Sequence, residues 1–283
     1  MERVLKKYNL IGDELFYHHT VTPPIGRDYV HEPEVHRQYE LLYLKEGRIS
    51  YVIDGKTYKA RSGDIILVSP GELHTIRIDG SRAYERIVIL FDMELFKRML
   101  EEIKLELSLF SEGTTLKFHI TKSDAVKKYG IDAIVKSIIA TEGEEKHRRL
   151  LIVAKLLELL AAFDRMAKDS GEPDTTPDSE DRLVRRVADY VEEHIAERMT
   201  LDSIAAALFV SKSTLCHRFT AYMRISVNKY IAARRMTLAA DLIKRGATAQ
   251  EASAAVGYEN YSAFFHVFKK TYGIPPTGLK EKQ

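Results

Sequence analysis

The sequence contains a single cysteine, Cys216, and this scarcity excludes several classes of protein. One cysteine cannot form an internal disulfide, so the chain fits a reducing, cytoplasmic setting. The sequence also lacks a Cys-rich zinc pattern, a phosphate-binding glycine loop and a nucleophile paired with a base. It has no run of about 18 apolar residues and no apolar signal region near its N-terminus, so we expect neither a membrane span nor a membrane partner.

The hydrophobic content of the sequence is sufficient to form ordinary cores in two domains. The chain has 283 residues, of which 45% are hydrophobic, and this length favours two domains over one. Charge is unevenly distributed, because residues 181–283 carry 16 Lys and Arg against 10 Asp and Glu, whereas the remainder carries 27 against 31. A basic C-terminal part fits nucleic-acid binding, although a solvated surface explains the same charge.

The C-terminal part contains the same unit twice, between residues 203 and 279. A shift of 49 residues brings equivalent side chains together: Ser211 with Asn260, Ser213 with Ser262, Leu215 with Phe264, His217 with His266, and Phe219 with Phe268. Each copy reads as a short helix, a tight turn and a second helix, which is the helix-turn-helix pattern. Thr200 and Ser211 are placed to cap helices of the first copy. Thr248 and Glu251 have the spacing of a capping box in the second.

A long helical stretch, Val227–Arg245, joins the two units and ends at Gly246, a natural stop. At 1.5 Å per residue it spans roughly 28 Å, and half-sites one DNA turn apart lie about 34 Å apart. We therefore expect a rigid connector that sets two recognition helices in successive major grooves on one face of a duplex.

Fixed positions throughout residues 184–280 carry a resemblance to a known family. They are Ile204-Ala205, Val210-Ser211, Ser213, Leu215, Phe219, Arg235-Met236, Ala239, Leu242-Ile243, Val256-Gly257-Tyr258, Phe264, Phe268-Lys269-Lys270 and Gly273. With these residues the segment resembles the DNA-binding domain of AraC/XylS-type transcription regulators. The sequence departs from that family at His217 and His266, where the family usually has Arg, and at Arg224, where it usually has Gly.

The resemblance implies double-stranded operator DNA as a partner and assigns the contacts to two recognition helices. In the first, base edges would be met by Ser213, Cys216 and His217, and the DNA backbone by Lys212, Thr214 and Arg218. In the second, the equivalents are Asn260, Tyr261, Ser262, Phe265 and His266, with Lys269 and Lys270 as phosphate candidates. Because histidine titrates near pH 6.5, contacts through the two histidines predict DNA binding that strengthens as the pH falls.

Two of these residues allow more than one interpretation. Phe265 fits apolar contact with a thymine methyl group, and it equally fits packing against Tyr261. Cys216 fits a small neutral contact residue or, if its thiolate were stabilised, a thiol that senses oxidants.

Short β-rich runs separated by Gly and Asp turns occupy the segment from about Leu15 to Phe118, and Asp54-Gly55 is a hairpin signal. Evenly spaced short strands predict an antiparallel barrel or sandwich. The positions His36, Glu40, Gly47, Gly55, Gly63-Asp64, Pro70-Gly71 and His74 resemble those of the cupin-type barrels that precede the DNA-binding domain in many AraC-type proteins. The expected fold class is α+β: a cupin-like antiparallel β-barrel with following helices, then an all-α domain of two helix-turn-helix units joined by a long helix.

The mouth of a small barrel is a usual place for a small-molecule pocket. Candidate ligand-binding residues are His36, Tyr39, Glu40, Tyr51 and His74. Of these, His36, Glu40 and His74 have the chemistry to hold Zn, Mn, Fe or Ni. Metal-binding cupins usually carry a histidine where this chain has Glu34, so the sequence by itself favours an organic ligand, with no metal and no other cofactor.

Helical periodicity begins after the barrel. The stripe from Arg149 to Phe163 is apolar on more than one side, so one side can cover the barrel and another a second subunit, the alternative being a core helix within one chain. Lys168–Asp181 has acidic and hydroxyl residues, which predicts a flexible linker rather than a capped loop. The expected domains are a barrel at 1–120, a helical dimerisation segment at 121–168, a linker at 169–181 and a DNA-binding domain at 182–283.

Together these features predict a transcription regulator, not an enzyme, in which a small-molecule effector in the barrel controls operator binding by a homodimer. Carbohydrates are frequent effectors in the family that it resembles, and RNA polymerase is a further partner if the regulator is an activator. Two alternatives stay open: a metal-dependent cupin enzyme fused to a DNA-binding domain, and a regulator without a ligand whose barrel serves only assembly.

Overall fold

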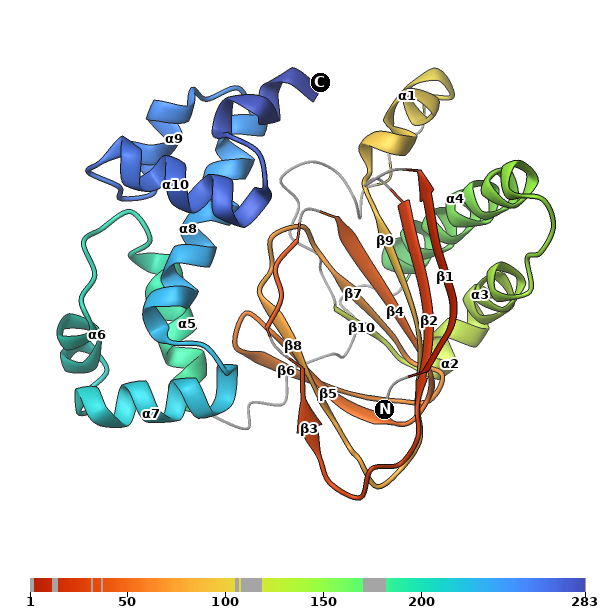
Figure 1. Cartoon of the computed structure of the whole chain (residues 1–283), viewed down its shortest axis with the longest axis horizontal. Helices are drawn as coiled ribbons and strands as arrows, with labels where there is room; N and C mark the ends of the chain where they lie inside the picture. The colour runs from red at the N-terminus through yellow and green to blue at the C-terminus, as the bar shows by residue number, and fades with distance from the viewer. Residues whose placement is uncertain are drawn as a thin grey trace.

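The N-terminal part of the chain forms two antiparallel sheets that face each other across a common interior (Figure 1). The computed structural model describes residues 3–11, 15–31, 33–36, 38–104, 107, 119–169 and 182–282. One sheet has the strand order β1-β2-β9-β4-β7-β10 and the other β3-β8-β5-β6. The strands are β1 (Arg3–Ile11), β2 (Leu15–Thr22), β3 (Tyr29–Val30), β4 (Tyr39–Glu46), β5 (Arg48–Ile53), β6 (Lys56–Arg61), β7 (Ile65–Val68), β8 (His74–Ile78), β9 (Tyr84–Phe91) and β10 (Ile120–Thr121).

The predicted hairpin is confirmed at the β5–β6 turn. Ile53 pairs with Lys56, which leaves Asp54 and Gly55 as a two-residue turn. Both turn residues have positive φ, 44° and 78°, the backbone that a tight turn between twisted strands needs.

Side chains alternate between the two faces of the six-stranded sheet. On β4, Leu42 and Leu44 point into the interior shared with the other sheet. Their neighbours Leu41 and Tyr43 pack on the opposite face, in a second core made with helices. Because both faces are buried, these strands read as nearly continuous apolar runs.

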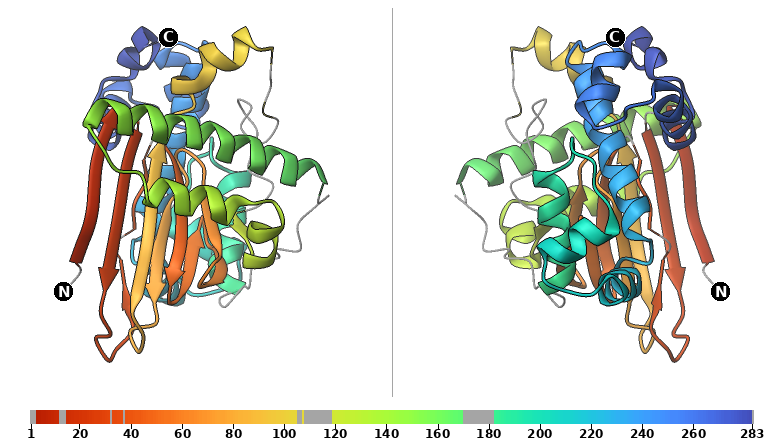
Figure 2. Two further views of the ribbon diagram at one scale, coloured as in Figure 1. Left: turned by 90° about the vertical axis from the view of Figure 1, so that its right-hand side faces the viewer. Right: turned by 90° about the vertical axis from the view of Figure 1, so that its left-hand side faces the viewer.

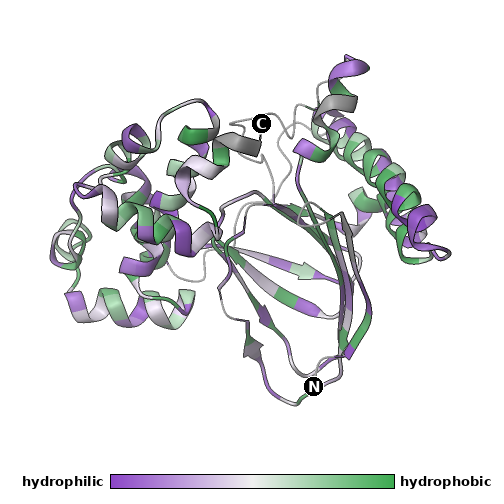
Figure 3. Cartoon of the chain, turned by 45° about the horizontal axis from the view of Figure 1, so that its top comes forward, coloured by the Kyte–Doolittle hydropathy of each residue, from purple (hydrophilic) through white to green (hydrophobic). Residues whose placement is uncertain are grey.

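Helices that follow the strands cover that opposite face: α2 (Ser123–Lys128), α3 (Ile131–Ile139) and α4 (Glu145–Asp169). Figure 2 shows α3 and α4 lying across the strands on the side away from the rest of the chain. In Figure 3, hydrophobic residues (green) recur along these helices and along the strands that they cover. The helical periodicity predicted after the barrel is therefore confirmed, whereas the expected linker, apart from Asp169, lies outside the described residues.

The prediction of strands throughout the segment from Leu15 to Phe118 is wrong at one place, because Glu94–Glu102 forms helix α1. Phe96 and Leu100, four residues apart, both pack against the core under the six-stranded sheet, which is helical spacing. Residues 105–106 and 108–118 of the same segment lie outside the described residues.

The C-terminal part is all helical and confirms the repeated unit. Its helices are α5 (Arg182–Glu193), α6 (Leu201–Ala207), α7 (Lys212–Met223), α8 (Val227–Lys244), α9 (Ala249–Ala255) and α10 (Tyr261–Tyr272), followed by a 3-10 helix at Pro276–Lys282. Among all the described helices, none combines the length and apolarity that crossing a bilayer requires.

The predicted caps of these helices are present. The Thr200 hydroxyl accepts from the Ser203 amide, and the Ser211 hydroxyl accepts from the Thr214 amide. Thr248 and Glu251 form the expected capping box, with the Glu251 carboxylate 2.7 Å from the Thr248 amide. These bonds satisfy backbone groups that the first turn of a helix leaves open, so they fix where each helix begins.

Candidate effector cavity and nucleic-acid interface

A cavity of about 240 Å³ lies between the two sheets of the barrel. The interior face of the six-stranded sheet contributes alternate residues of β2 and β9 and one residue of β4, and β5 and β8 close the other side. The lining residues are Phe16, His18, His31, Glu34, Glu40, Tyr51, His74, Thr75, Ile76, Arg86, Val88 and Leu90. Polar groups and apolar side chains therefore line one cavity, which is the usual composition of a small-molecule site.

Glu40, Tyr51 and His74 form the polar floor of this cavity, and all three are buried. The Tyr51 hydroxyl donates to Glu40 Oε1 at 2.5 Å. The other carboxylate oxygen, Oε2, lies 3.6 Å from His74 Nε2 and 3.2 Å from Nε2 of His36. The same three residues, His36, Glu40 and His74, offer ligand atoms within 4.8 Å of one another and could hold a metal ion.

The charges on this floor depend on one another. Burial opposes ionisation of Glu40, but the two imidazoles outweigh it and hold the pKa of this carboxyl well below its usual range. Burial also opposes the charged form of His74, yet the Glu40 carboxylate raises the pKa of the imidazole. Burial and then the Glu40 charge raise the pKa of Tyr51 well above its usual value, so the phenol stays a donor. A negative carboxylate thus lies in a buried site, where a cation or hydrogen-bond donors around it stabilise its charge.

The structure brings most of the predicted ligand-binding residues together and separates one. Glu40, Tyr51 and His74 line the cavity, and His36 reaches them from its edge. Tyr39 lies on the opposite face of the sheet, where its ring stacks on Phe91 with centroids 5.5 Å apart, so it lies outside the cavity.

Sequence reasoning missed the cavity residues contributed by β2 and β9. They are Phe16 and His18 on β2, and Arg86, Val88 and Leu90 on β9. The signal was present, because positions two apart on a strand share a face. It could be used only with the knowledge that β2, β9 and β4 are neighbours.

The second candidate site is the surface formed by α7 and α10, the second helices of the two units. Both helices lie crosswise to α8, one towards each of its ends (Figures 1 and 2). Most of the predicted DNA-contacting side chains on them are exposed: Lys212, Ser213, Thr214, His217 and Arg218 on the first helix, and Asn260, Tyr261, Ser262, His266, Lys269 and Lys270 on the second. Cys216 and Phe265 are half-buried. These exposed side chains on both helices are therefore accessible to a partner.

Three of these residues also make contacts within the DNA-binding part of the chain. The Asn260 side-chain oxygen accepts from the amides of Ser262 and Ala263 and so caps α10. Lys212 Nζ lies 2.8 Å from an Asp202 carboxylate oxygen, an exposed pair that a phosphate can replace. The ring centroids of Phe265 and Tyr261 lie 6.4 Å apart, which supports the packing interpretation of Phe265.

Comparison with known proteins assigns both parts of the chain. A model described as AraC-like ligand binding domain matches residues 23–160, and a helix-turn-helix domain model matches residues 204–282. The chain belongs to the AraC/XylS family of transcription regulators. It is a DNA-binding regulator with a ligand-binding domain, and the expected α+β fold class is confirmed.

Relatives of this AraC-type chain span most of its length. YdiP of Escherichia coli K12, described as an uncharacterised HTH-type transcriptional regulator, is 25% identical over 256 residues, which cover 90% of this chain and 80% of that protein. The arabinose operon regulatory protein of Escherichia coli K12 is 26% identical over 238 residues, or 81% and 76% of the two chains. The crystal structure of ToxT from Vibrio cholerae O395 superimposes with a TM-score of 0.38 and 14% identity, over 94% of this chain and 96% of that one.

In this AraC-type chain the barrel and the DNA-binding domain touch through α5, α7 and α8. Arg234 of α8 bonds Asp54 of the β5–β6 turn at 2.7 Å, and the Arg77 guanidinium on β8 donates to the Tyr222 carbonyl at the end of α7, also at 2.7 Å. Val52 of β5 shares a hydrophobic core with helices of the DNA-binding domain. The two domains therefore form an interface with polar and apolar contacts.

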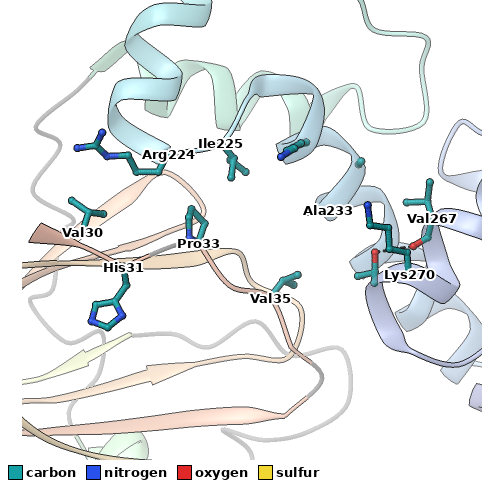
Figure 4. A pocket seen from close by; sticks show the side chains of 12 residues that line it. Val30, His31, Pro33, Val35, Arg224, Ile225, Ala233, Val267 and Lys270 are labelled. Atoms are coloured by element: carbon teal, nitrogen blue, oxygen red, sulfur yellow. Dashed lines mark hydrogen bonds between the residues drawn. The ribbon is translucent and has the colours of Figure 1, made fainter. Parts of the chain in front are cut away.

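Beside that interface a groove of about 900 Å³ separates the two domains (Figure 4). Val30, Pro33 and Val35 line it from the barrel, and Arg224, Ile225, Ala233, Val267 and Lys270 are among the residues that line it from the DNA-binding domain. Lys270, expected at a DNA phosphate, thus lies on the wall of this groove.

Proposed function

We propose that this regulator changes its affinity for operator DNA when a small molecule binds in the barrel cavity. The observation that carries the proposal is that one short segment, residues 69–74, which is the β7–β8 loop with the first residue of β8, contacts both the cavity and α8. At the cavity end, His74 lines the floor and its Nδ1 donates to the Glu72 carbonyl at 2.8 Å. At the other side, the Thr237 hydroxyl of α8 donates to the Gly71 carbonyl at 2.6 Å.

A second contact ties the same loop to α8 through the β5–β6 turn. Asp54 of that turn accepts from the Leu73 amide at 3.2 Å and from the Arg234 guanidinium at 2.7 Å. A displacement of residues 69–74 therefore reaches α8 at two points, Thr237 and Arg234. Because α8 connects both helix-turn-helix units, its docking on the barrel also sets where the two recognition helices lie.

An effector can use this connection only if it binds one domain arrangement better than another, since equal affinity shifts nothing. A molecule that fills the cavity contacts Glu40 and His74, and these contacts favour one position of the loop. We therefore expect the effector to change how α8 docks on the barrel and, through this change, the affinity for DNA.

The cavity indicates a compact, hydroxyl-rich effector. Its volume of about 240 Å³ lies below the ~300–1,000 Å³ typical of sites for drug-sized ligands. Glu40, Tyr51 and His74 offer hydrogen bonds on one side, and Phe16 and Ile76 offer apolar contact on another. A monosaccharide has hydroxyl groups and an apolar C–H face, so we propose a carbohydrate of this size as the effector class.

The same proposal divides the work along the chain. Residues 1–120 bind the effector, 121–168 pair two copies, 169–181 link the domains and 182–283 bind the operator. Pairing of two copies is supported by α4. Leu150 is 67% exposed and Leu151 is 45% exposed on this helix, whose other face is buried. If the regulator activates transcription, RNA polymerase is its further partner.

The test uses the full-length chain. An operator is first selected from a random pool of duplexes, and monosaccharides and their derivatives are then screened by thermal shift, since a ligand at 100 times its Kd adds about 2.7 kcal/mol of stability. We expect a stabilising sugar to change operator affinity by about fivefold or more, the usual range of coupling between sites.

Tyr51→Phe removes a hydroxyl from the cavity floor, so it weakens sugar binding by about tenfold. Tyr39→Phe makes the same change outside the cavity and leaves sugar binding intact.

Two results would overturn the proposal. A sugar that stabilises the chain but leaves operator affinity unchanged would show that the cavity binds without controlling DNA. Equal loss of sugar binding in the two tyrosine variants would show that the ligand binds elsewhere.

A further inference from the structure

Three side chains with metal-ligand chemistry converge at one edge of the cavity floor. Glu40 comes from β4, His74 begins β8, and His36 precedes β4. Their ligand atoms all lie within 4.8 Å of one another. The sequence alone argued against a metal, because Glu34 stands where metal-binding cupins usually carry a histidine. The structure shows that the remaining three donors meet without it.

The spacing of these donors matches a shared ion. Glu40 Oε2 lies 3.2 Å from His36 Nε2 and 3.6 Å from His74 Nε2. Two ligands bound about 2.1 Å from a metal at tetrahedral or octahedral angles lie about 3.0–3.4 Å from each other. Each nitrogen therefore lies within a few tenths of an ångström of that range from the Glu40 oxygen, and the two nitrogens, which lie within 4.8 Å of each other, would draw closer around the ion.

The hydrogen bonds of the two histidines select the atoms that face the carboxylate. His36 Nδ1 lies 3.0 Å from the Gln38 carbonyl, and His74 Nδ1 lies 2.8 Å from the Glu72 carbonyl. A carbonyl oxygen only accepts, so each Nδ1 carries the hydrogen. In a neutral ring the lone pair is then on Nε2, and both Nε2 atoms point at an oxygen of Glu40. Two nitrogen lone pairs and a carboxylate oxygen repel one another unless protons on the two Nε2 atoms or a shared metal ion lie between them.

This arrangement is the one that supports metal-bound histidines in general, in which the other ring nitrogen donates to a carbonyl or carboxylate and fixes the ring. The carboxylate is fixed in the same way, because the Tyr51 hydroxyl holds its Oε1 at 2.5 Å. Backbone bonds in both directions between Glu34 and His74, at 2.8 and 3.0 Å, join the segment before β4 to β8. The donors are therefore held in place by contacts outside the cluster.

We propose that His36, Glu40 and His74 bind one divalent first-row transition-metal ion. Two imidazole nitrogens and one carboxylate oxygen suit Zn²⁺, Fe²⁺, Mn²⁺ or Ni²⁺. Glu40 and His74 also line the cavity, so the remaining coordination positions of the ion face the space that the effector would occupy. The metal binding needs neither DNA nor an effector, so it stands or falls independently of the proposed control of transcription.

The experiment titrates the full-length, chelator-treated chain with Zn²⁺ by calorimetry and with Co²⁺ by visible absorption. We expect one ion per chain and, with Co²⁺, the absorption of an ion with nitrogen and oxygen ligands. Glu40→Gln and His74→Asn each remove one of three ligands, and we expect them to weaken binding by at least about 100-fold, beyond the 10–100-fold typical of losing an outer-shell partner. His18→Asn removes another histidine of the same cavity and should leave the affinity unchanged.

A measurement on the wild-type chain guards against variants that fail to fold. In ¹⁵N-labelled protein, Zn²⁺ should shift the Nε2 resonances of two histidines and leave the other imidazoles in place. Absence of saturable binding at one ion per chain would overturn the proposal. Binding that survives both Glu40→Gln and His74→Asn in folded protein, or Zn²⁺ shifts confined to histidines other than His36 and His74, would overturn it as well.

Discussion

Arg234 of α8 and Asp54 of the β5–β6 turn form an ion pair that joins the DNA-binding domain to the barrel, with Nη1 2.7 Å from Oδ2. Glu192 of α5 contacts the same guanidinium, with its Oε1 2.6 Å from Nε. The side chain of Arg234 is only 17% exposed to solvent, and that of Asp54 is 21% exposed. Removing one partner of this largely buried pair leaves the other charge without a partner and with little water around it, which lowers the stability of the fold.

The variant Arg234→Gln is therefore expected to lower the free energy of unfolding by about 1–3 kcal/mol, less than for a fully buried pair because some water reaches Asp54. Denaturant unfolding of the full-length chain measures it. Arg185→Gln is the matched control, since the Arg185–Asp189 pair is 3.9 Å long and exposed. Equal losses in the two variants would show that the domain-joining pair has no special role.

The loss in Arg234→Gln should depend on pH. Burial raises the pKa of Asp54 to about 6, and Arg234 opposes this only in part. The folded-state pKa lies above the unfolded value of about 3.9, so protonation of Asp54 stabilises the folded chain at low pH, and this contribution is lost as the pH rises through about 6. Without Arg234 the pKa of Asp54 rises further, so the loss is expected to be largest near pH 8 and to shrink towards pH 5.

The measurement is the difference in unfolding free energy between wild type and Arg234→Gln at several pH values, in which groups far from the pair cancel. Glu72 and Glu192 are the other carboxylates that act on Asp54. A difference that stays constant between about pH 5 and pH 8 would contradict the assignment.

DNA binding is expected to strengthen as the pH falls, because His217 and His266 are exposed on α7 and α10. Histidine side chains in general gain a positive charge below about pH 6.5, and positive charge near phosphate raises affinity. Each added phosphate contact steepens the dependence of log K on log salt by about 0.9, so the slope should steepen by about 2 between pH 8 and pH 5.5.

Operator affinity is measured in a salt series at each pH, for wild type and for His217→Gln/His266→Gln. The double variant should bind with a nearly pH-independent slope. The same pH response in both proteins would exclude these histidines as the source.

Dimerisation is expected to depend on the exposed leucines of α4. Leu150→Glu/Leu151→Glu removes two apolar side chains from the proposed contact, each worth about 1.5 kcal/mol or more when buried, so the dimer Kd should rise by about 100-fold. Sedimentation equilibrium measures it. Ile103→Glu alters an apolar residue that keeps 62% of its exposure just after α1, so the dimer should persist in this variant. A monomeric wild-type chain would refute the pairing itself.

The all-helical part was predictable almost element by element. Helix starts such as Ser211 and Thr248 are set by side chains that bond amides three residues away, so the information lies within one turn of helix. The barrel was less predictable. Strand β1 left no recognisable pattern, and α1 was taken for strand because short apolar runs fit both periods. Tyr39 and Glu40 show the limit at the site, since adjacent strand residues face opposite sides and the sequence could not say which side was the cavity.

The amino-acid sequence by itself determined the helix-turn-helix repeat, its connecting helix and the presence of a short-stranded barrel, because caps, turns and periodicity act over a few residues. Only the tertiary structure decided that Glu40, Tyr51 and His74 share a cavity with residues of β2 and β9, and that α8 docks on the loops beside that cavity. These contacts join residues up to 180 positions apart, as Asp54 and Arg234 are. Their pairing depends on how whole strands and helices pack, which no local pattern records.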